Sequence, residues 1–187
     1  MNDAAGQLPG IFVTLDEALE REFEQAVRDS TELAVRVAFG VLRRREDAED
    51  VAQEAFTRAY RRFAALRDRQ QFRAWIVRVT WRLAIDRWRG DRRRTLREQT
   101  AAAERRESTV EDAAAGAERS ALLWKAVDAL PEKLRIVVVL SALEGHDVRD
   151  VARLLDIPEG TVKSRLFLAR KELARSLTCL ANDSATR

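Results

Sequence analysis

The segment 143–173 constrains the fold more than any other part of this chain, because it holds two short helical patterns separated by a break. Apolar residues recur on one side of the first pattern, which stops at Pro158 and Gly160 before a second pattern begins. The second pattern has basic residues around an apolar stripe made of Val162, Leu166 and Leu173. Two helices joined by a tight turn, the second of them basic, are the layout of a DNA-binding helix-turn-helix. The segment therefore predicts a local helical unit that could contact DNA.

Helical spacing of apolar residues extends over most of the remaining chain, and the composition supports it. Among 187 residues there are only 7 Gly and 3 Pro, and Ala, Leu, Arg and Glu dominate, which favours helix. We predict an all-α protein. The expected helices are one that follows the capping-box residues Thr14 and Glu17, then 31–43, 46–63, 71–89, 120–130 and 132–143, and the two helices of the helix-turn-helix.

Residues 95–118 interrupt this pattern, because they contain almost no large apolar side chains. They carry three Arg and six acidic residues, which is a net charge of −3. Such a segment cannot bury enough apolar surface to fold alone, so we predict a flexible linker. The chain then divides into two small helical domains, 14–94 and 119–180.

The predicted helix 46–63 begins with four acidic residues, Glu46, Asp47, Glu49 and Asp50. Carboxylates in a first turn offset the helix dipole, and helix stabilisation alone would explain them. The polar face then continues with Gln53, Glu54 and Thr57. No basic residue follows one turn later before Arg58, so a second hypothesis is that this face binds a basic partner. The spacing by itself leaves both hypotheses open.

Tryptophan and arginine are concentrated in 73–94, which holds three of the four Trp and eight Arg. One helical side has Trp75, Arg78, Arg82 and Arg89, and the opposite side has Phe72, Ile76, Val79 and Leu83. Arginine neutralises phosphates, and aromatic faces stack on unpaired bases at about 1–3 kcal/mol each, so the first side suits nucleic acid. The alternative is that the Trp residues pack in the core and the Arg residues are only solvated.

The second helix of the helix-turn-helix carries side chains suited to DNA. Thr161 and Ser164 can donate to phosphates, while Lys163 and Arg165 can reach base edges or the backbone. Helix-turn-helix patterns also occur in proteins that bind no DNA, so the motif alone is moderately specific.

Nothing in the sequence favours catalysis, a metal or a cofactor. The single cysteine, Cys179, excludes an internal disulfide, and the single histidine, His146, has no second histidine with which to bind zinc. No Gly-rich phosphate loop, metal-ligand cluster or nucleophile–His pair is present. No apolar run approaches the about 18 residues that span a bilayer, and the N-terminus lacks a signal-peptide pattern. We expect a soluble cytoplasmic protein that is not an enzyme and needs no metal or cofactor.

Taken together, the residues from about 17 to 177 resemble the extracytoplasmic-function (group 4) sigma factors of the sigma-70 family. Three segments carry the resemblance: EDAEDVAQEAFTRAYRRF resembles region 2.2, FRAWIVRVTWRLAIDRWR resembles regions 2.3 and 2.4, and ALPEKLRIVVVLSALEGHDVRDVARLLDIPEGTVKSRLFLARKEL resembles region 4. The three occur in the order and spacing of the family, which is far more specific than any one of them. The chain has no counterpart of the region 3 domain found in larger sigma factors, as this group also lacks it.

The resemblance implies a transcription initiation factor that binds core RNA polymerase, directs it to a promoter and helps to open the duplex. By this resemblance the β′ clamp helices of the polymerase would be bound by Asp50, Gln53, Glu54 and Thr57. The −10 element would be contacted by Trp75, Arg78, Trp81, Arg82 and Arg89. The −35 element would be contacted by Thr161, Lys163, Ser164, Arg165, Phe167 and Arg170. The face around 137–143 would lie under the β flap, and the acidic linker would run toward the RNA exit channel. The family also implies an anti-sigma partner.

One position departs from the family pattern. Many relatives have an Asn where this chain has Arg82, so we expect an altered −10 preference or a phosphate contact there. A different hypothesis for the whole chain is a stand-alone helix-turn-helix regulator that binds its own operator. That hypothesis leaves the Trp- and Arg-rich helix and the acidic helix start without a role, and such regulators usually dimerise.

Overall fold

The computed structural model describes residues 17–66, 68–102 and 115–185, and within these ranges the chain forms helices and no strand. The all-α fold expected from the composition is therefore confirmed. The elements in chain order are α1 Glu17–Leu42, α2 Arg45–Phe63, the short 3-10 helix η1 Arg69–Gln71, α3 Phe72–Ala102, α4 Ala115–Ala129, α5 Glu132–Val138, the π-helical turn η2 Val139–Leu143, α6 Val148–Leu155 and α7 Glu159–Ala185.

Helix α1 is one continuous helix, which corrects the prediction of two helices meeting near residue 31. The expected break lay at Ser30 and Thr31, two residues that favour helix ends because their hydroxyls compete for backbone groups. Here the Thr31 hydroxyl donates to the carbonyl of Val27, 2.7 Å away and one turn earlier. Ser30 is buried within the helix. The Thr31 hydroxyl thus has a hydrogen-bond acceptor inside the helix, and the helix does not have to end here.

The end of α1 depends on Arg43, which has a left-handed backbone conformation with φ of 61°. Its guanidinium donates to the carbonyls of Gly40 and Val41 at 2.6 and 3.0 Å. A cationic side chain that binds the last carbonyls of a helix both satisfies them and opposes the helix dipole. The chain reverses here, and α2 begins two residues later, close to the predicted start at 46.

The segment 95–118, predicted to be a linker, is helical at both ends. Helix α3 runs beyond the expected end at 89 to Ala102, and α4 begins at Ala115. Residues 103–114 lie outside the described part of the chain. Residues 90–102 contain a single Gly, Gly90, and no Pro. One glycine costs a helix about 1 kcal/mol, which does not end α3 here.

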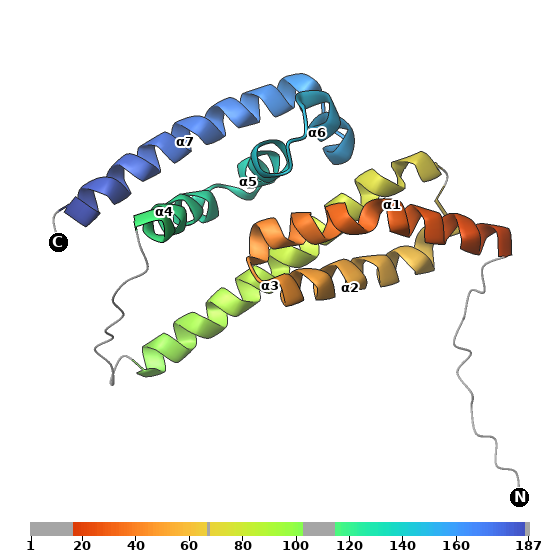
Figure 1. Ribbon diagram of the computed structural model, residues 1–187, viewed down its shortest axis with the longest axis horizontal. Coiled ribbons are helices and arrows are strands. Elements are labelled where there is room, and N and C mark those ends of the chain that lie inside the picture. The colour runs from red at the N-terminus through yellow and green to blue at the C-terminus, as the bar shows by residue number, and fades with distance from the viewer. Residues whose placement is uncertain (1–16, 67, 103–114, 186–187) are drawn as a thin grey trace, which may run out of the picture.

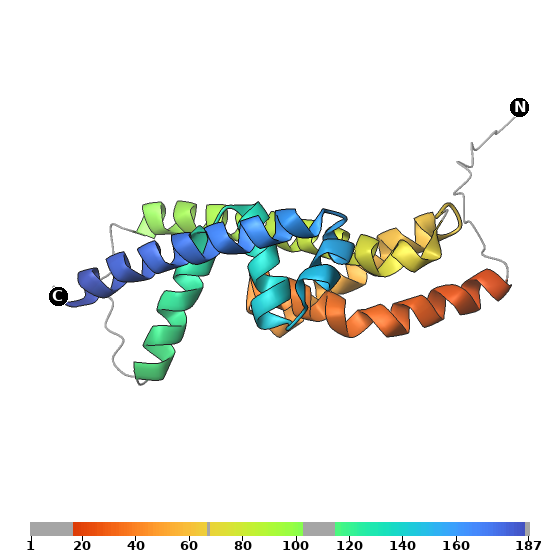
Figure 2. The same cartoon turned by 90° about the horizontal axis from the view of Figure 1, so that it is seen from above.

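Helices α1, α2 and α3 lie side by side, and α4 to α7 form a second group beside the C-terminal end of α1 and part of α3 (Figure 1). Turned by 90°, the same arrangement shows α7 running close to the direction of α3 (Figure 2). A single apolar core joins both groups, with side chains from α1, α2 and α3 in contact with those of η2, α6 and α7. A smaller cluster of Leu130, Val138 and Ala169 holds the second group together.

The backbone of α1 at Gly40 packs directly against the side chain of Val139 in η2. A β-carbon placed at Gly40 would lie 2.7 Å from Cγ1 of Val139, which is shorter than a van der Waals contact. Glycine is therefore required here for space rather than for backbone conformation. Val139 and its neighbours Val137 and Leu140 are fully buried in consequence.

Candidate nucleic-acid interface

The helix-turn-helix predicted from the sequence is formed by α6 and α7. The carboxylate of Asp147 caps α6 by accepting from the backbone N–H of Asp150 at 2.8 Å, which lowers the pKa of that carboxyl. The turn begins at Asp156, whose φ of 57° ends α6 in the left-handed region. The carbonyl of Pro158 then accepts from the N–H groups of Thr161 and Val162 and starts α7. Backbone hydrogen bonds therefore hold the two helices at a defined angle.

One face of α7 is cationic and exposed. Val162 and Leu166 of the predicted apolar stripe are buried, and Leu173 is half-buried. Ala169, which was not part of that prediction, is buried beside them. The exposed residues Lys163, Phe167 and Arg170 follow each other at four- and three-residue steps and so share a face. Among the described residues, no carboxylate lies within ion-pair distance of Lys163, Arg165 or Arg170. These cations are thus free to neutralise phosphates.

Phe167 is the most exposed large apolar side chain of that face, with 68% of its surface accessible. Thr161 and Arg165 are half-buried at the edges of the face. Ser164 is exposed, but its hydroxyl donates to the carbonyl of Thr161 at 3.0 Å. All six residues expected to contact the −35 element thus lie on α7, with Lys163, Phe167 and Arg170 the most available.

On α3 the structure separates the predicted nucleic-acid residues into accessible and covered ones. Arg82 and Arg89 are exposed, and Trp75 and Arg78 are half-buried. Trp75 lies against Phe72, with ring centroids 6.5 Å apart. The opposite apolar stripe is buried at Phe72, Ile76 and Leu83, while Val79 is half-buried.

Trp81 differs from the expectation, because only 4% of its surface is accessible. Its indole Nε1 donates to Oε1 of Glu132 on α5 at 3.3 Å. The Arg89 guanidinium donates to the other oxygen of the same carboxylate at 3.0 Å. In this arrangement Trp81 is therefore part of the contact between the two helix groups and is not presented to nucleic acid. The helical spacing could not reveal this, because the covering residue lies 51 positions away along the chain.

The third tryptophan of α3, Trp88, is half-buried between two guanidinium groups. The Arg135 guanidinium lies 4.6 Å from its ring centroid and that of Arg92 lies 5.4 Å away. Burial lowers the pKa of Arg135, and the nearby Asp128 carboxylate opposes that shift. A guanidinium titrates so far above neutral pH that Arg135 stays charged. Trp88 thus serves as an aromatic platform for cations within the protein.

The acidic start of α2 has basic partners that precede it on the same helix or lie on α3. Glu49 pairs with Arg45 at 2.7 Å on the preceding turn, and Glu54 pairs with Arg58 at 2.5 Å. Arg87 of α3 pairs with Asp50 at 3.5 Å and also contacts Asp47. Sequence reasoning missed Arg87 because it searched only one turn ahead on the same helix.

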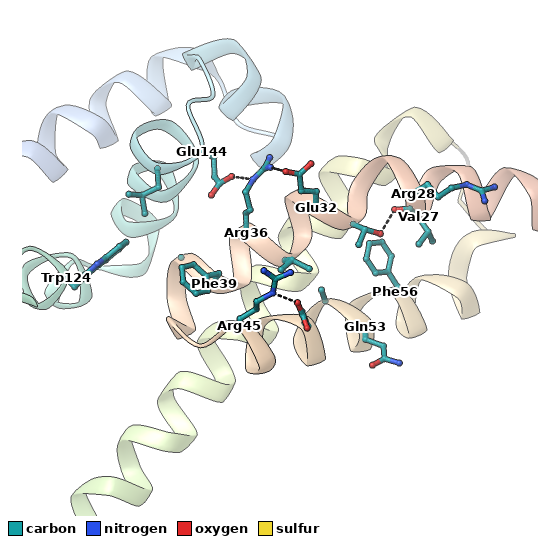
Figure 3. A pocket seen from close by; sticks show the side chains of 16 residues that line it. Val27, Arg28, Glu32, Arg36, Phe39, Arg45, Gln53, Phe56, Trp124 and Glu144 are labelled. Carbon is teal, nitrogen blue, oxygen red and sulfur yellow. Dashed lines mark hydrogen bonds and ion pairs between the residues drawn. The ribbon is translucent and has the colours of Figure 1, made fainter. Parts of the chain in front are cut away.

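Beside α2 lies an apolar groove of about 1180 Å³ between α1, α2 and the second helix group. Figure 3 shows Phe39, Phe56, Arg36 and Arg45 among the side chains that line it. Gln53, expected to contact the polymerase, is one of its lining residues, whereas Thr57 hydrogen-bonds to the backbone of its own helix at 2.9 Å. Phe39, which is 44% accessible, was not anticipated. Leu143, also 44% accessible, was expected only as part of the face around 137–143. An exposed apolar residue carries no sequence signal that separates it from a buried one.

Comparisons with known proteins match both halves of the chain. Residues 26–94 match the family described as Sigma-70 region 2, and residues 120–173 match Sigma-70, region 4. The ECF RNA polymerase sigma-E factor of Haemophilus influenzae is 30% identical over 180 residues, which cover 87% of this chain and 95% of that protein. The ECF RNA polymerase sigma factor SigW of Bacillus subtilis is 32% identical over 145 residues, covering 70% and 75%.

Solved structures share the fold. The structure of CnrH in complex with the cytosolic domain of CnrY matches with a TM-score of 0.58 at 22% identity, covering 86% of this chain and 90% of that one. The sigma factor RpoE from Bartonella quintana, in complex with the anti-sigma factor NepR, matches with a TM-score of 0.51 at 20% identity, covering 84% and 98%. Across the part of the chain that the structure describes, no helix is both long and apolar enough to cross a membrane.

Proposed function

The chain belongs to the extracytoplasmic-function sigma factors of the sigma-70 family. From this premise we propose which of its helices contact the promoter and which contact core RNA polymerase. The stand-alone regulator is not favoured, because both family regions are present in order. The observation that carries the assignment of roles is the unpaired cationic face of α7 together with the accessible arginines of α3. In this proposal residues 14–94 and 119–180 act as two units, and residues 95–118 connect them.

Helix α7 contacts the −35 element in this proposal. Lys163 and Arg165 reach base edges or phosphates, Thr161 and Ser164 donate to phosphates, and Arg170 neutralises a phosphate. Phe167 supplies an apolar surface that can contact a thymine methyl group. The absence of ion pairs to the α7 cations among the described residues supports this role, because no ion pair has to break before these cations bind DNA. The Ser164 hydroxyl would exchange its hydrogen bond to the Thr161 carbonyl for one to a phosphate.

Helix α3 contacts the −10 element through its accessible side. Arg78, Arg82 and Arg89 neutralise phosphates, and Trp75 offers a ring edge beside them. Arg82 is exposed and has no carboxylate partner among the described residues, which supports a direct role in −10 preference. Trp81 joins this surface only where Glu132 has moved away from it.

Core polymerase binds the α2 face and the adjoining groove. Asp50, Gln53, Glu54 and Thr57 line one side of α2 at helical spacing and would meet the β′ clamp helices. The π-helical turn η2 and its neighbours, 137–143, would meet the β flap. An anti-sigma factor is a further expected partner, because the similar sigma factor RpoE was solved in complex with the anti-sigma factor NepR. The activity is that of an initiation factor in the cytoplasm, without an active site of its own.

The test is promoter-specific transcription by the full chain with purified core polymerase, on DNA selected by this holoenzyme from a random pool. Lys163→Ala should lower transcription about tenfold on templates that contain the −35 element, since one base contact contributes about 1–3 kcal/mol. Lys133→Ala is the matched control, because Lys133 is exposed on α5 outside the proposed DNA surface. An equal loss on templates lacking the −35 element would contradict the role given to α7.

A further inference from the structure

Two carboxylates at the start of α2 meet a single guanidinium of α3. Nη2 of Arg87 donates to Oδ1 of Asp47, and Nη1 of the same residue lies 3.5 Å from Oδ2 of Asp50. Asp47 and Asp50 are three residues apart and therefore share one face of α2. Among the described residues, these two ion pairs are the only ones that join α2 to α3. Arg87 thus forms a charged bridge between the two helices.

Asp47 is the covered end of this bridge. Only 14% of its side chain is accessible, and its second oxygen, Oδ2, lies 3.3 Å from Nε of Arg44. Hydrogen bonds between a guanidinium and a carboxylate are strong and directional, so a half-buried carboxylate held by two guanidinium groups has little freedom to change its rotamer. Asp47 therefore fixes the Arg87 guanidinium on the side of α3 that packs against α2.

Asp50 is the accessible end of the bridge. Its side chain is 63% accessible, and it belongs to the α2 face proposed above to meet the β′ clamp helices. A carboxylate offers about four acceptor positions, so Asp50 can contact Arg87 through Oδ2 and still accept from a partner through Oδ1. Without Arg87, Asp47 and Asp50 would be like charges on one helix face, which repel each other. Arg87 therefore offsets this repulsion and restricts the conformations of Asp50.

We propose that Arg87 is a positioning residue for polymerase binding, which holds Asp50 in the orientation that core polymerase recognises. The inference rests on the role proposed above for Asp50. Arg87 is not part of the α3 surface proposed for the −10 element, because a step of two residues turns the side chain by about 200° around the helix, away from Arg89. Restraining a side chain before it binds lowers the entropic cost of association. Arg87 thus raises the affinity for polymerase through Asp50 rather than by direct contact.

The first measurement is the apparent affinity of the full chain for purified core polymerase in the absence of DNA. Arg87→Ala should lower this affinity about three- to tenfold, which is the order of the cost of immobilising one side chain. Arg87→Lys should lose less, because an ammonium group keeps the charge but cannot fork to two carboxylates. Arg93→Ala is the matched control and should leave the affinity unchanged, since it removes the same charge from an exposed position of α3 that has no carboxylate partner among the described residues. Circular dichroism checks that each variant keeps its helical content.

A double-mutant cycle with Asp50→Asn then separates positioning from a purely structural role. In the Asp50→Asn background, Arg87→Ala should lower the affinity for polymerase by less than about twofold further, because Arg87 acts through Asp50 and the two losses are not independent. Losses that multiply would overturn the proposal. An Arg87→Ala protein that binds polymerase as tightly as the wild type, or more tightly, would overturn it as well.

Failure of the proposed function would give a different result. If Asp50→Asn alone left the affinity for polymerase unchanged, the role given to the α2 face would be wrong, and with it the positioning role of Arg87. At a saturating concentration of the sigma factor, promoter-specific transcription by Arg87→Ala should return to the wild-type level, since only affinity is lost. A deficit that remains at saturation would show that Arg87 acts on promoter DNA, and this result would also overturn the proposal.

Discussion

At the scale of single residues, Arg135 shows how this small protein uses a buried charge. Only 5% of its surface is accessible, yet its guanidinium donates to the carbonyls of Asp128 and Leu130 at the end of α4 and lies over the ring of Trp88. Two of its nitrogens, Nε and Nη1, have no hydrogen-bond partner. Burying a cation with incomplete hydrogen bonding lowers the stability of the fold. The contacts of Arg135 with the carbonyls and with Trp88 must therefore offset this desolvation penalty. It ties the turn at Pro131 to the aromatic surface of α3.

Replacing Arg135 by Ala should lower the free energy of unfolding by about 2–4 kcal/mol, because two carbonyls lose a charged donor and a cavity forms beside Trp88. Urea unfolding followed by circular dichroism measures the change. Arg175→Ala is the control, since Arg175 is 77% accessible and within the described ranges pairs only with Glu172. It should change the free energy of unfolding by less than about 0.5 kcal/mol. If Arg135→Ala lowered the free energy of unfolding no more than the control does, the carbonyls of Asp128 and Leu130 would be hydrogen-bonded to water in the variant.

At the scale of single elements, α6 is a short helix that depends on its cap. It spans Val148–Leu155, and its first free N–H groups are served by the Asp147 carboxylate. That hydrogen bond holds the pKa of Asp147 below its ordinary value. Because the pKa is lower in the folded chain, the bond stabilises the fold above the unfolded pKa of about 3.9. The stabilisation is lost as pH falls through the lower, folded value.

Asp147→Ala should therefore unfold at a lower urea concentration than the wild type at pH 7, and the difference should shrink below about pH 4. Asp147→Asn retains an acceptor that does not titrate, so it should keep most of its stability in acid. Hydrogen exchange of the α6 amides at each pH locates the effect on this helix. A difference between wild type and Asp147→Ala that persists unchanged at pH 3 would contradict the role of the carboxylate.

The individual elements also show where sequence reasoning succeeds. Helix α2 was predicted within one residue of its bounds, because its apolar residues recur without interruption and Phe63 ends them. The two helices predicted between residues 14 and 43 form one helix in the structure, because the apolar stripe continues past residue 31 through Leu33, Val37 and Val41. Tertiary burial of that stripe outweighs local propensity.

At the scale of the whole molecule, the contact between Gly40 and Val139 decides how closely the two helix groups can lie. An alanine in the middle of a helix is favoured over glycine by about 1 kcal/mol. At Gly40, however, the added methyl group would meet Val139 at 2.7 Å. Gly40→Ala therefore raises the helix propensity of α1 but opposes the association of the two helix groups.

Gly40→Ala should increase the radius of gyration of the full chain, measured by small-angle X-ray scattering, while the helical content rises or stays constant. Adding Val139→Ala should restore the compact value, because the new methyl group then fills the space left by the valine side chain. Gly90→Ala is the control, since a β-carbon there meets no atom within 4 Å. A compact Gly40→Ala protein would mean that Val139 moves aside at little cost.

The sequence by itself determined the all-helical class, the helix-turn-helix, the cationic face of α7 and the concentration of Trp and Arg on α3. Each of these depends on side chains a few positions apart on one helix, where spacing alone sets which residues share a face. Only the tertiary structure decided that Trp81 is buried beneath Glu132, that Arg87 pairs with the acidic start of α2, and that both halves share one core. Helical periodicity shows which face is apolar but not which distant element covers it, and an amphipathic residue such as Trp or Arg is suited to either environment.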